Sequence, residues 1–192
     1  MTQRILQQEQ ESGLVHRAKD GDGDAFAQLY DAYIEQVYRF VHYRVGERQL
    51  AEDLSADTFL KAWEHLDRYE ERGLPFGAWL FRIARNTVID HYRTRKAQVQ
   101  WDETVFQIED PDAPDVAEAV GTQLAAERVI GALDALTDDQ RDVLILKFLQ
   151  GMNTATVADI MEKKPGAIRA LQMRGLQALQ TIMGVTDEVA DV

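Results

Sequence analysis

Apolar residues recur at spacings of three and four along most of this chain, and that period is the feature that most limits its fold. The clearest early example comprises Phe26, Leu29, Tyr33, Val37, Phe40 and Val41. This spacing places side chains on one face of an α-helix. No useful length of alternating apolar and polar residues is present, and the 192 residues include only four prolines. The sequence therefore predicts an all-α protein.

Capping residues and helix breakers place the ends of the helices. The helices are predicted at residues 24–45, 48–66, 77–96, 117–136, 137–150, 156–162 and 165–183. Asp22 or Asp24 can cap the first of them, and Thr137 with Gln140 matches a capping box. Pro165 suits the first position of the last helix, because its missing N–H would be unpaired there in any case. Residues 67–76 are predicted to be a loop.

The acidic excess of the chain is concentrated in its middle. The net charge is −12 for the whole chain, −2 for residues 1–97, −10 for residues 98–140 and 0 for residues 141–192. Residues 98–116 hold two prolines and six acidic residues with little periodicity. That composition predicts a flexible linker extended by charge repulsion, and so two small helical domains on either side of it.

Two short windows are basic despite the acidic total. Residues 78–97 have a net charge of +4 and residues 161–181 a net charge of +3. An acidic protein is a poor match for a phosphate backbone, which is bound through Lys and Arg. The local excess of positive charge nevertheless leaves nucleic acid open as a partner.

The C-terminal basic window has the layout of a helix-turn-helix. A short helix, a tight turn and a longer helix follow one another, and Ile168 and Leu171 would face the core. The residues left largely on the other side are Arg169, Gln172, Met173 and Arg174. Arg can pair with guanine and Gln with adenine in the major groove, while Lys163 and Lys164 suit phosphates at the turn. A plain helical bundle with a basic surface is the alternative.

The other basic window combines cations with an aromatic residue beside the predicted loop. The polar residues that share one helix face are Arg82, Arg85, Asn86, Arg93 and Lys96. Trp79 lies one turn earlier. Aromatic stacking beside cations that follow the backbone suits single-stranded or distorted nucleic acid. For Trp79 taken alone, a place in the core beside Leu80 and Ile83 is the stronger interpretation.

Metal binding and catalysis find little support in the sequence. Asp20, Asp22, Asp24 and Asp31 imitate the spacing of a calcium-binding loop, but Ala25 stands where such a loop needs glycine. Helix capping explains Asp22 and Asp24 with fewer assumptions. The four histidines lack metal-ligand spacing, and the chain has no P-loop, no G-x-S-x-G and no cysteine. We expect no metal, no cofactor and no enzymatic activity.

Three segments together resemble a known family. They are residues 51–63 (AEDLSADTFLKAW), residues 75–96 (PFGAWLFRIARNTVIDHYRTRK) and residues 136–179. In this order, and separated by an acidic linker, they resemble a bacterial RNA polymerase sigma factor of the sigma-70 superfamily, extracytoplasmic-function (ECF) group. The resemblance implies a cytoplasmic, non-enzymatic factor that binds core RNA polymerase and directs it to promoter DNA.

The resemblance also implies an organisation into regions. It gives an N-terminal tail (1–11), sigma region 2 (12–97), the acidic linker (98–116), sigma region 4 (117–183) and a C-terminal tail (184–192). Region 2 would dock on the polymerase and open the −10 element, and region 4 would read the −35 element. The linker's charge leads to the hypothesis that it occupies a basic channel of the polymerase. An anti-sigma factor is a further partner, and no membrane insertion is expected.

Site residues follow from the resemblance together with the helix-face patterns. The residues expected to dock on core polymerase are Asp53, Leu54, Asp57 and Lys61. The residues expected at the −10 element are Arg68, Tyr69, Phe76, Trp79, Arg82, Arg85, Asn86, Arg93 and Lys96. The residues expected at the −35 element are Lys163, Lys164, Arg169, Gln172, Met173 and Arg174.

The sequence departs from the family at four positions. Thr156 replaces a usual Glu, and Lys164 replaces the usual Ser cap before Pro165. Ala56 stands where a polar Gln is common in the docking helix, and Ala170 is too small to reach a base edge. The promoter sequence therefore does not follow by analogy. The alternative function is a helix-turn-helix transcription regulator that acts without being a polymerase subunit, and a more distant one is a helical interaction or calcium-sensing protein.

Overall fold

The structure is a computed structural model that describes residues 8–71, 75–99 and 128–183. In chain order its elements are α1 (Gln8–Lys19), α2 (Gly23–Val45), α3 (Arg48–Glu64), η1 (Leu66–Arg68), α4 (Phe76–Val99), α6 (Asp138–Leu144), η2 (Ile145–Leu149), α7 (Thr154–Met161) and α8 (Pro165–Ile182). Residues 128–134, just before α6, are also helical. Every ordered element of the described residues is thus a helix, which confirms the predicted fold class.

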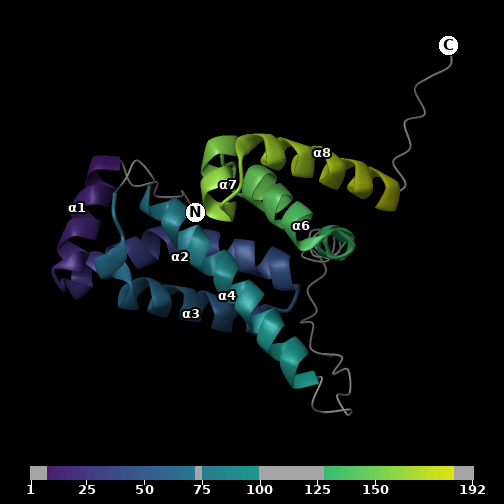
Figure 1. The fold of residues 1–192 in the computed structure, drawn as a ribbon. Coiled ribbons are helices and arrows are strands. Elements are labelled where there is room, and N and C mark those ends of the chain that lie inside the picture. Colours follow the sequence, from purple (N-terminus) through teal and green to yellow (C-terminus); the bar gives the residue numbers. More distant parts are fainter. Residues whose placement is uncertain (1–7, 72–74, 100–127, 184–192) are drawn as a thin grey trace, which may run out of the picture.

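The helices α1 to α4 pack together into what we call the N-terminal bundle, residues 8–99 (Figure 1). Helix α2 begins after Asp22, whose carboxylate accepts the Ala25 N–H at 3.1 Å. It ends at Gly46, whose φ of 78° places it in the left-handed region, where glycine carries no Cβ penalty. The predicted cap and the predicted helix 24–45 are both confirmed.

Helix α1 was not expected from the sequence, which placed residues 1–11 in a tail. Only Leu14, Val15 and Ala18 contribute buried apolar side chains from it, a stripe too narrow to give a clear period. The helix is instead stabilised by packing on α2 and by polar contacts to residues far along the chain. Short helices of this kind gain most of their stability from tertiary packing.

Helices α6, α7 and α8, with residues 128–134 and η2, form what we call the C-terminal unit, residues 128–183. Thr137 and Gln140 make both hydrogen bonds of the predicted capping box, and Pro165 occupies the first position of α8 as predicted. Two details differ from the sequence prediction. The helix that Thr137 opens becomes π-helical from Ile145, and α7 starts earlier than expected because Asn153 caps it.

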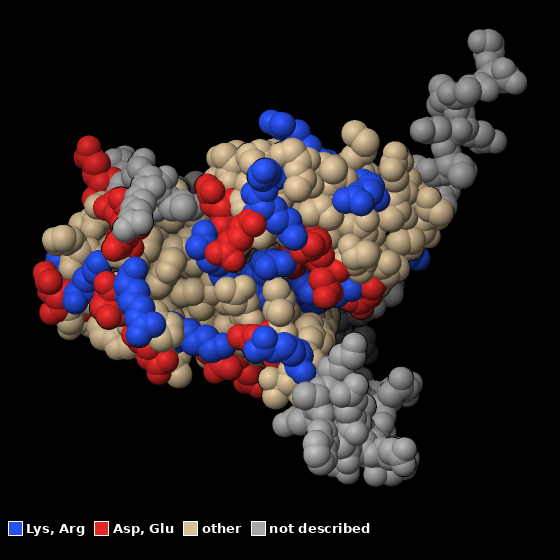
Figure 2. Space-filling model, in the orientation of Figure 1, with Lys and Arg blue, Asp and Glu red and all other residues tan. Residues whose placement is uncertain are grey.

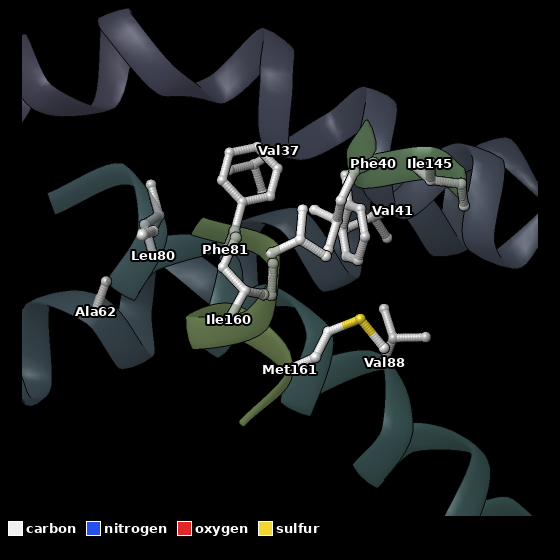
Figure 3. Close-up of a cluster of buried hydrophobic side chains, with 14 of the residues drawn as sticks. Val37, Phe40, Val41, Ala62, Leu80, Phe81, Val88, Ile145, Ile160 and Met161 are labelled. Carbon is white, nitrogen blue, oxygen red and sulfur yellow. The ribbon is translucent and has the colours of Figure 1, made fainter. Parts of the chain in front are cut away.

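The two predicted helical domains pack on each other and share one hydrophobic core. Helix α4 packs on α7, and α2 packs on η2. The close-up in Figure 3 draws Phe40, Val41 and Phe81 of the N-terminal bundle in one cluster with Ile145 and Ile160 of the C-terminal unit. All five are essentially inaccessible to water. Most of the acidic linker (98–116) and of both tails lies outside the described residues.

Candidate nucleic-acid interface

A buried cluster of opposite charges joins the two halves beside this core. Asp142 of α6 is fully buried, with its two carboxylate oxygens 2.9 Å from Arg44 Nε of α2 and 2.7 Å from Arg85 Nε of α4. Burial raises the pKa of Asp142, and the two guanidinium groups oppose that rise. Asp138 adds a contact to Arg44 at 2.8 Å, and Asp139 adds one to Arg85 at 3.0 Å.

Arg141, next to Asp142, is also buried and fully engaged. Its guanidinium donates to the carbonyl oxygens of Arg44 at 3.0 Å, Leu133 at 2.8 Å and Asp134 at 2.8 Å. Buried guanidinium groups need such acceptors, because unpaired buried charge is costly. The cluster therefore ties the end of α2 to the start of α6 from both sides.

The basic face of α4 points partly into this junction. Arg85 contacts Asp139 and Asp142, and Arg82 donates to the Asp159 carbonyl at 2.7 Å and lies 3.5 Å from the Glu162 carboxylate. Figure 2 shows blue and red side chains interleaved where the two halves meet. In this arrangement the C-terminal unit covers two of the cations that the sequence assigned to DNA.

The remaining polar residues of that face are open to solvent or not described. Asn86 and Arg93 are exposed, and Arg93 pairs with Asp90 at 3.2 Å. Arg68, at the end of η1, is also exposed. The side chain of Lys96 lies outside the described residues.

The aromatic residues near the start of α4 form a cluster rather than a surface. Tyr69 is 4% exposed and Phe76 1% exposed. The ring of Tyr69 lies 5.1 Å from that of Trp79 and 5.7 Å from that of Phe76, while Trp79 is half-buried. In this conformation Tyr69 and Phe76 do not present their side chains to solvent, because both rings complete the core of the N-terminal bundle; their contact with the −10 element stays a prediction.

Helix α8 presents its predicted face to solvent. Ile168 and Leu171 are buried against the rest of the C-terminal unit, as the spacing predicted. The polar residues opposite them are exposed at Arg169 and Arg174 and half-buried at Gln172. Met173, at 64% exposure, is the most exposed large apolar side chain among the described residues. The three exposed side chains, with the half-buried Gln172, are the candidate surface for duplex DNA.

The two lysines of the turn before α8 differ in their contacts. Lys164 is exposed, while Lys163 reaches back to Asp139 of α6 at 3.0 Å. Asp139 thus bridges Lys163 to Arg85, one predicted DNA contact from each half.

The predicted docking residues lie along α3 beside a groove of about 610 Å³ between α3 and α4. Asp53 and Asp57 are exposed at its edge, and Lys61 donates to Thr87 Oγ1 of α4 at 3.2 Å. Leu54 is only 4% exposed and belongs to the core, so the expectation that it contacts a partner is not met here. The apolar spacing of the same helix predicts that Leu60 and Trp63 face inward. That prediction is wrong, because both side chains are exposed.

The structure does not support a calcium-binding loop at residues 20–31. Asp22 caps α2 and pairs with Arg17 at 2.6 Å; the Ala25 N–H and this arginine lower the pKa of Asp22. Within the described ranges no cluster of His, Cys, Asp and Glu is arranged to hold a metal ion. Over the same ranges, no helix combines the length and the apolar character needed to cross a lipid bilayer.

Comparison with known proteins gives two family matches that fall on the two halves. The model of Sigma-70 region 2 matches residues 29–98, and that of Sigma-70, region 4 matches residues 126–179. The ECF RNA polymerase sigma factor BldN of Streptomyces coelicolor is 38% identical over 174 residues, which cover 88% of this chain and 64% of BldN. The chain therefore spans just under two thirds of that relative's length.

A second curated relative and a solved structure are also similar to this chain. The ECF RNA polymerase sigma factor SigW of Bacillus subtilis is 26% identical over 174 residues, covering 86% of this chain and 92% of SigW. Among solved structures, the sigma factor RpoE of Bartonella quintana, in complex with the anti-sigma factor NepR, matches with a TM-score of 0.69 and 29% identity. That match covers 83% of this chain and 97% of the RpoE chain.

Proposed function

This chain belongs to the sigma-70 family of RNA polymerase sigma factors and to its ECF group, and from that premise we propose that it is a transcription initiation factor. It binds core RNA polymerase and directs it to promoters. It acts as a specificity subunit without enzymatic activity, in the cytoplasm, where the promoters lie. Region 2 spans residues 12–97 and region 4 spans residues 117–183.

The observation that carries this proposal is the free face of α8. Arg169, Met173 and Arg174 are exposed on the side away from the buried Ile168 and Leu171, and Gln172 is half-buried beside them. The second helix of a helix-turn-helix enters the major groove and reaches base edges with such side chains. Arg and Gln supply the donor geometry that guanine and adenine accept. Region 4 is therefore proposed to read the −35 element with α8, and Lys164, exposed at the turn, is proposed to contact a phosphate.

The −10 element is proposed to bind along α4 and the segment before it. Arg68, Asn86 and Arg93 are exposed in this structure, whereas Arg82 and Arg85 are held by the C-terminal unit. Binding of a DNA strand to these two arginines therefore requires the two halves to separate. The buried rings of Tyr69 and Phe76 pack beneath the proposed DNA-binding surface and hold it in place, and the half-buried Trp79 lies at the edge of that surface.

Two protein partners complete the proposal. Asp53 and Asp57 of α3, with Lys61 beside them, are proposed to contact core polymerase, and Leu54 holds that helix in place from the core. An anti-sigma factor is proposed as a regulator, because the similar RpoE structure is a complex with one. No such partner is identified by the residues of this chain.

The test is transcription in vitro with core RNA polymerase and a randomised promoter library. We expect the chain to co-purify with core polymerase and to enrich promoters with two conserved elements. If the chain instead binds duplex DNA tightly without polymerase and supports no transcription with it, it is a conventional helix-turn-helix regulator. That outcome would refute the proposal.

A further inference from the structure

Helix α1 makes polar contacts to three residues on the two sides of the loop that leads into α4. Lys19 Nζ donates to the Tyr69 carbonyl at 2.7 Å, and Ser12 Oγ donates to the Glu71 carboxylate at 2.8 Å. On the other side of the loop, the Phe76 N–H donates to Glu11 Oε1 at 2.8 Å. One short helix thus fixes both the exit from η1 and the entry into α4.

Glu11 makes the most buried of these contacts. It is only 8% exposed, and its second carboxylate oxygen accepts a hydrogen bond from the Tyr33 hydroxyl of α2. The first N–H groups of a helix have no partner within the helix. Glu11 satisfies the first of them from another helix, and a carboxylate there also lies favourably at the positive end of the helix dipole. Its position therefore defines where α4 begins.

Tyr33 holds this carboxylate in place. Burial and the nearby Glu11 carboxylate raise the pKa of Tyr33, so the hydroxyl remains a donor at all physiological pH values. The ring lies 5.8 Å from Phe76 and directly against Gly77. A Cβ at Gly77 would stand 2.8 Å from the Tyr33 ring, so only glycine lets the ring approach the first turn of α4 this closely.

We propose that α1 positions the −10 reading surface, with Glu11 as its principal positioning residue. This inference rests on the proposed function, since it concerns Phe76 and the α4 helix that it begins. A promoter strand that must be unstacked and held at defined points tolerates little displacement of the groups that hold it. Glu11 touches no DNA; it acts by fixing Phe76 and the start of α4.

The test compares promoter opening by holoenzymes that carry substitutions in α1. Glu11→Ala leaves the buried Phe76 N–H and Tyr33 hydroxyl without their acceptor. We expect it to lower opening, measured by permanganate reactivity of the −10 element, by about tenfold. Glu11→Gln retains an acceptor for Phe76 and a donor for the Tyr33 oxygen, and we expect it to restore most of the activity. Exposed Glu9→Ala, on the same helix, is the matched control and should open promoters normally.

Two further measurements separate positioning from general loss of structure. The affinity of Glu11→Ala for core polymerase and for −35 duplex DNA should stay within about twofold of the parent. Hydrogen exchange at the Phe76 amide of the free protein should become at least about tenfold faster, since its acceptor is gone. Lys19→Met, at an exposed position, should lower opening by about threefold without loss of the fold.

The outcomes distinguish this inference from the proposed function. If the parent holoenzyme opens no promoter, the proposed function fails, while the exchange experiment still tests the cap. If the parent opens promoters and Glu11→Ala opens them equally well, the positioning role is refuted. It is also refuted if core affinity falls in the same proportion as opening, because the substitution would then act only through stability.

Discussion

The charge cluster at Asp142 predicts that this one carboxylate controls the equilibrium between molecules whose two halves are in contact and molecules whose halves are apart. Asp142→Ala removes the shared counter-charge of Arg44 and Arg85, of which Arg44 is only 3% exposed. Removing one partner of a buried ion pair costs about 3–5 kcal/mol. Because Asp138 still contacts Arg44 and Asp139 still contacts Arg85, we expect a cost at the lower end, about 3 kcal/mol. We call the arrangement in this structure closed and an arrangement with the two halves apart open. In the open molecule both arginines are hydrated, so the substitution destabilises only the closed molecule. The ratio of closed to open molecules should therefore fall by a factor of about 10².

The opening can be followed by fluorescence energy transfer, since the chain has no cysteine of its own. Cysteines introduced at exposed Glu52 of α3 and exposed Gln180 of α8 give one dye in each half. We expect Asp142→Ala to populate a low-transfer state while the helical circular dichroism signal is retained. The free variant should also bind a single-stranded −10 oligonucleotide more tightly, because Arg82 and Arg85 are uncovered.

Asp90→Ala is the matched control, since it breaks the exposed pair with Arg93 on α4. Exposed pairs contribute about 0–1 kcal/mol, so transfer should stay at the parental value. An Asp142→Ala protein with the same closed population as the parent would refute the reasoning. The apolar contacts around Ile145 and Ile160 would then suffice to hold the halves together.

Three other predictions follow from the same geometry. Arg174→Ala should lower promoter-specific transcription while core binding, measured by pull-down, is unchanged; loss of core binding would contradict the division of labour between the halves. Thr137→Ala should destabilise the C-terminal unit by about 1 kcal/mol in denaturant unfolding, with Thr137→Ser close to the parent, because the capping box needs the side-chain oxygen. Burial and the nearby Arg48 lower the pKa of His42 below its usual 6.5. At a pH near or below 6.5 the unfolded chain therefore binds more protons than the folded protein. The free energy of unfolding should consequently fall as the pH drops from about 6.5 through the lowered pKa of His42. In His42→Gln that part of the pH dependence should vanish, and an unchanged profile would exclude His42 as its source.

The sequence was sufficient for the helices whose signals are local. Asp22, the Thr137–Gln140 capping box and Pro165 each act within a few residues of their own position, so the helix starts they predict agree with the structure. The face of α8 is equally local, since Ile168 and Leu171 decide which side chains are left outside. Helix α1 escaped detection because its apolar stripe holds only three buried residues.

What only the tertiary structure decided is which polar residues are buried. Glu11, Arg44 and Asp142 read as solvated charges in the sequence, because charged side chains are rarely buried unless they are paired. Their partners lie far away along the chain: 65 residues separate Glu11 from Phe76, and 98 separate Arg44 from Asp142. A periodic pattern of apolar residues indicates which side of a helix is buried, but it does not indicate which distant helix packs against that side. The sequence alone therefore determined the helices with local signals and the face of α8. Helix α1, the contact between the halves and the cap on α4 depend on packing between distant parts of the chain.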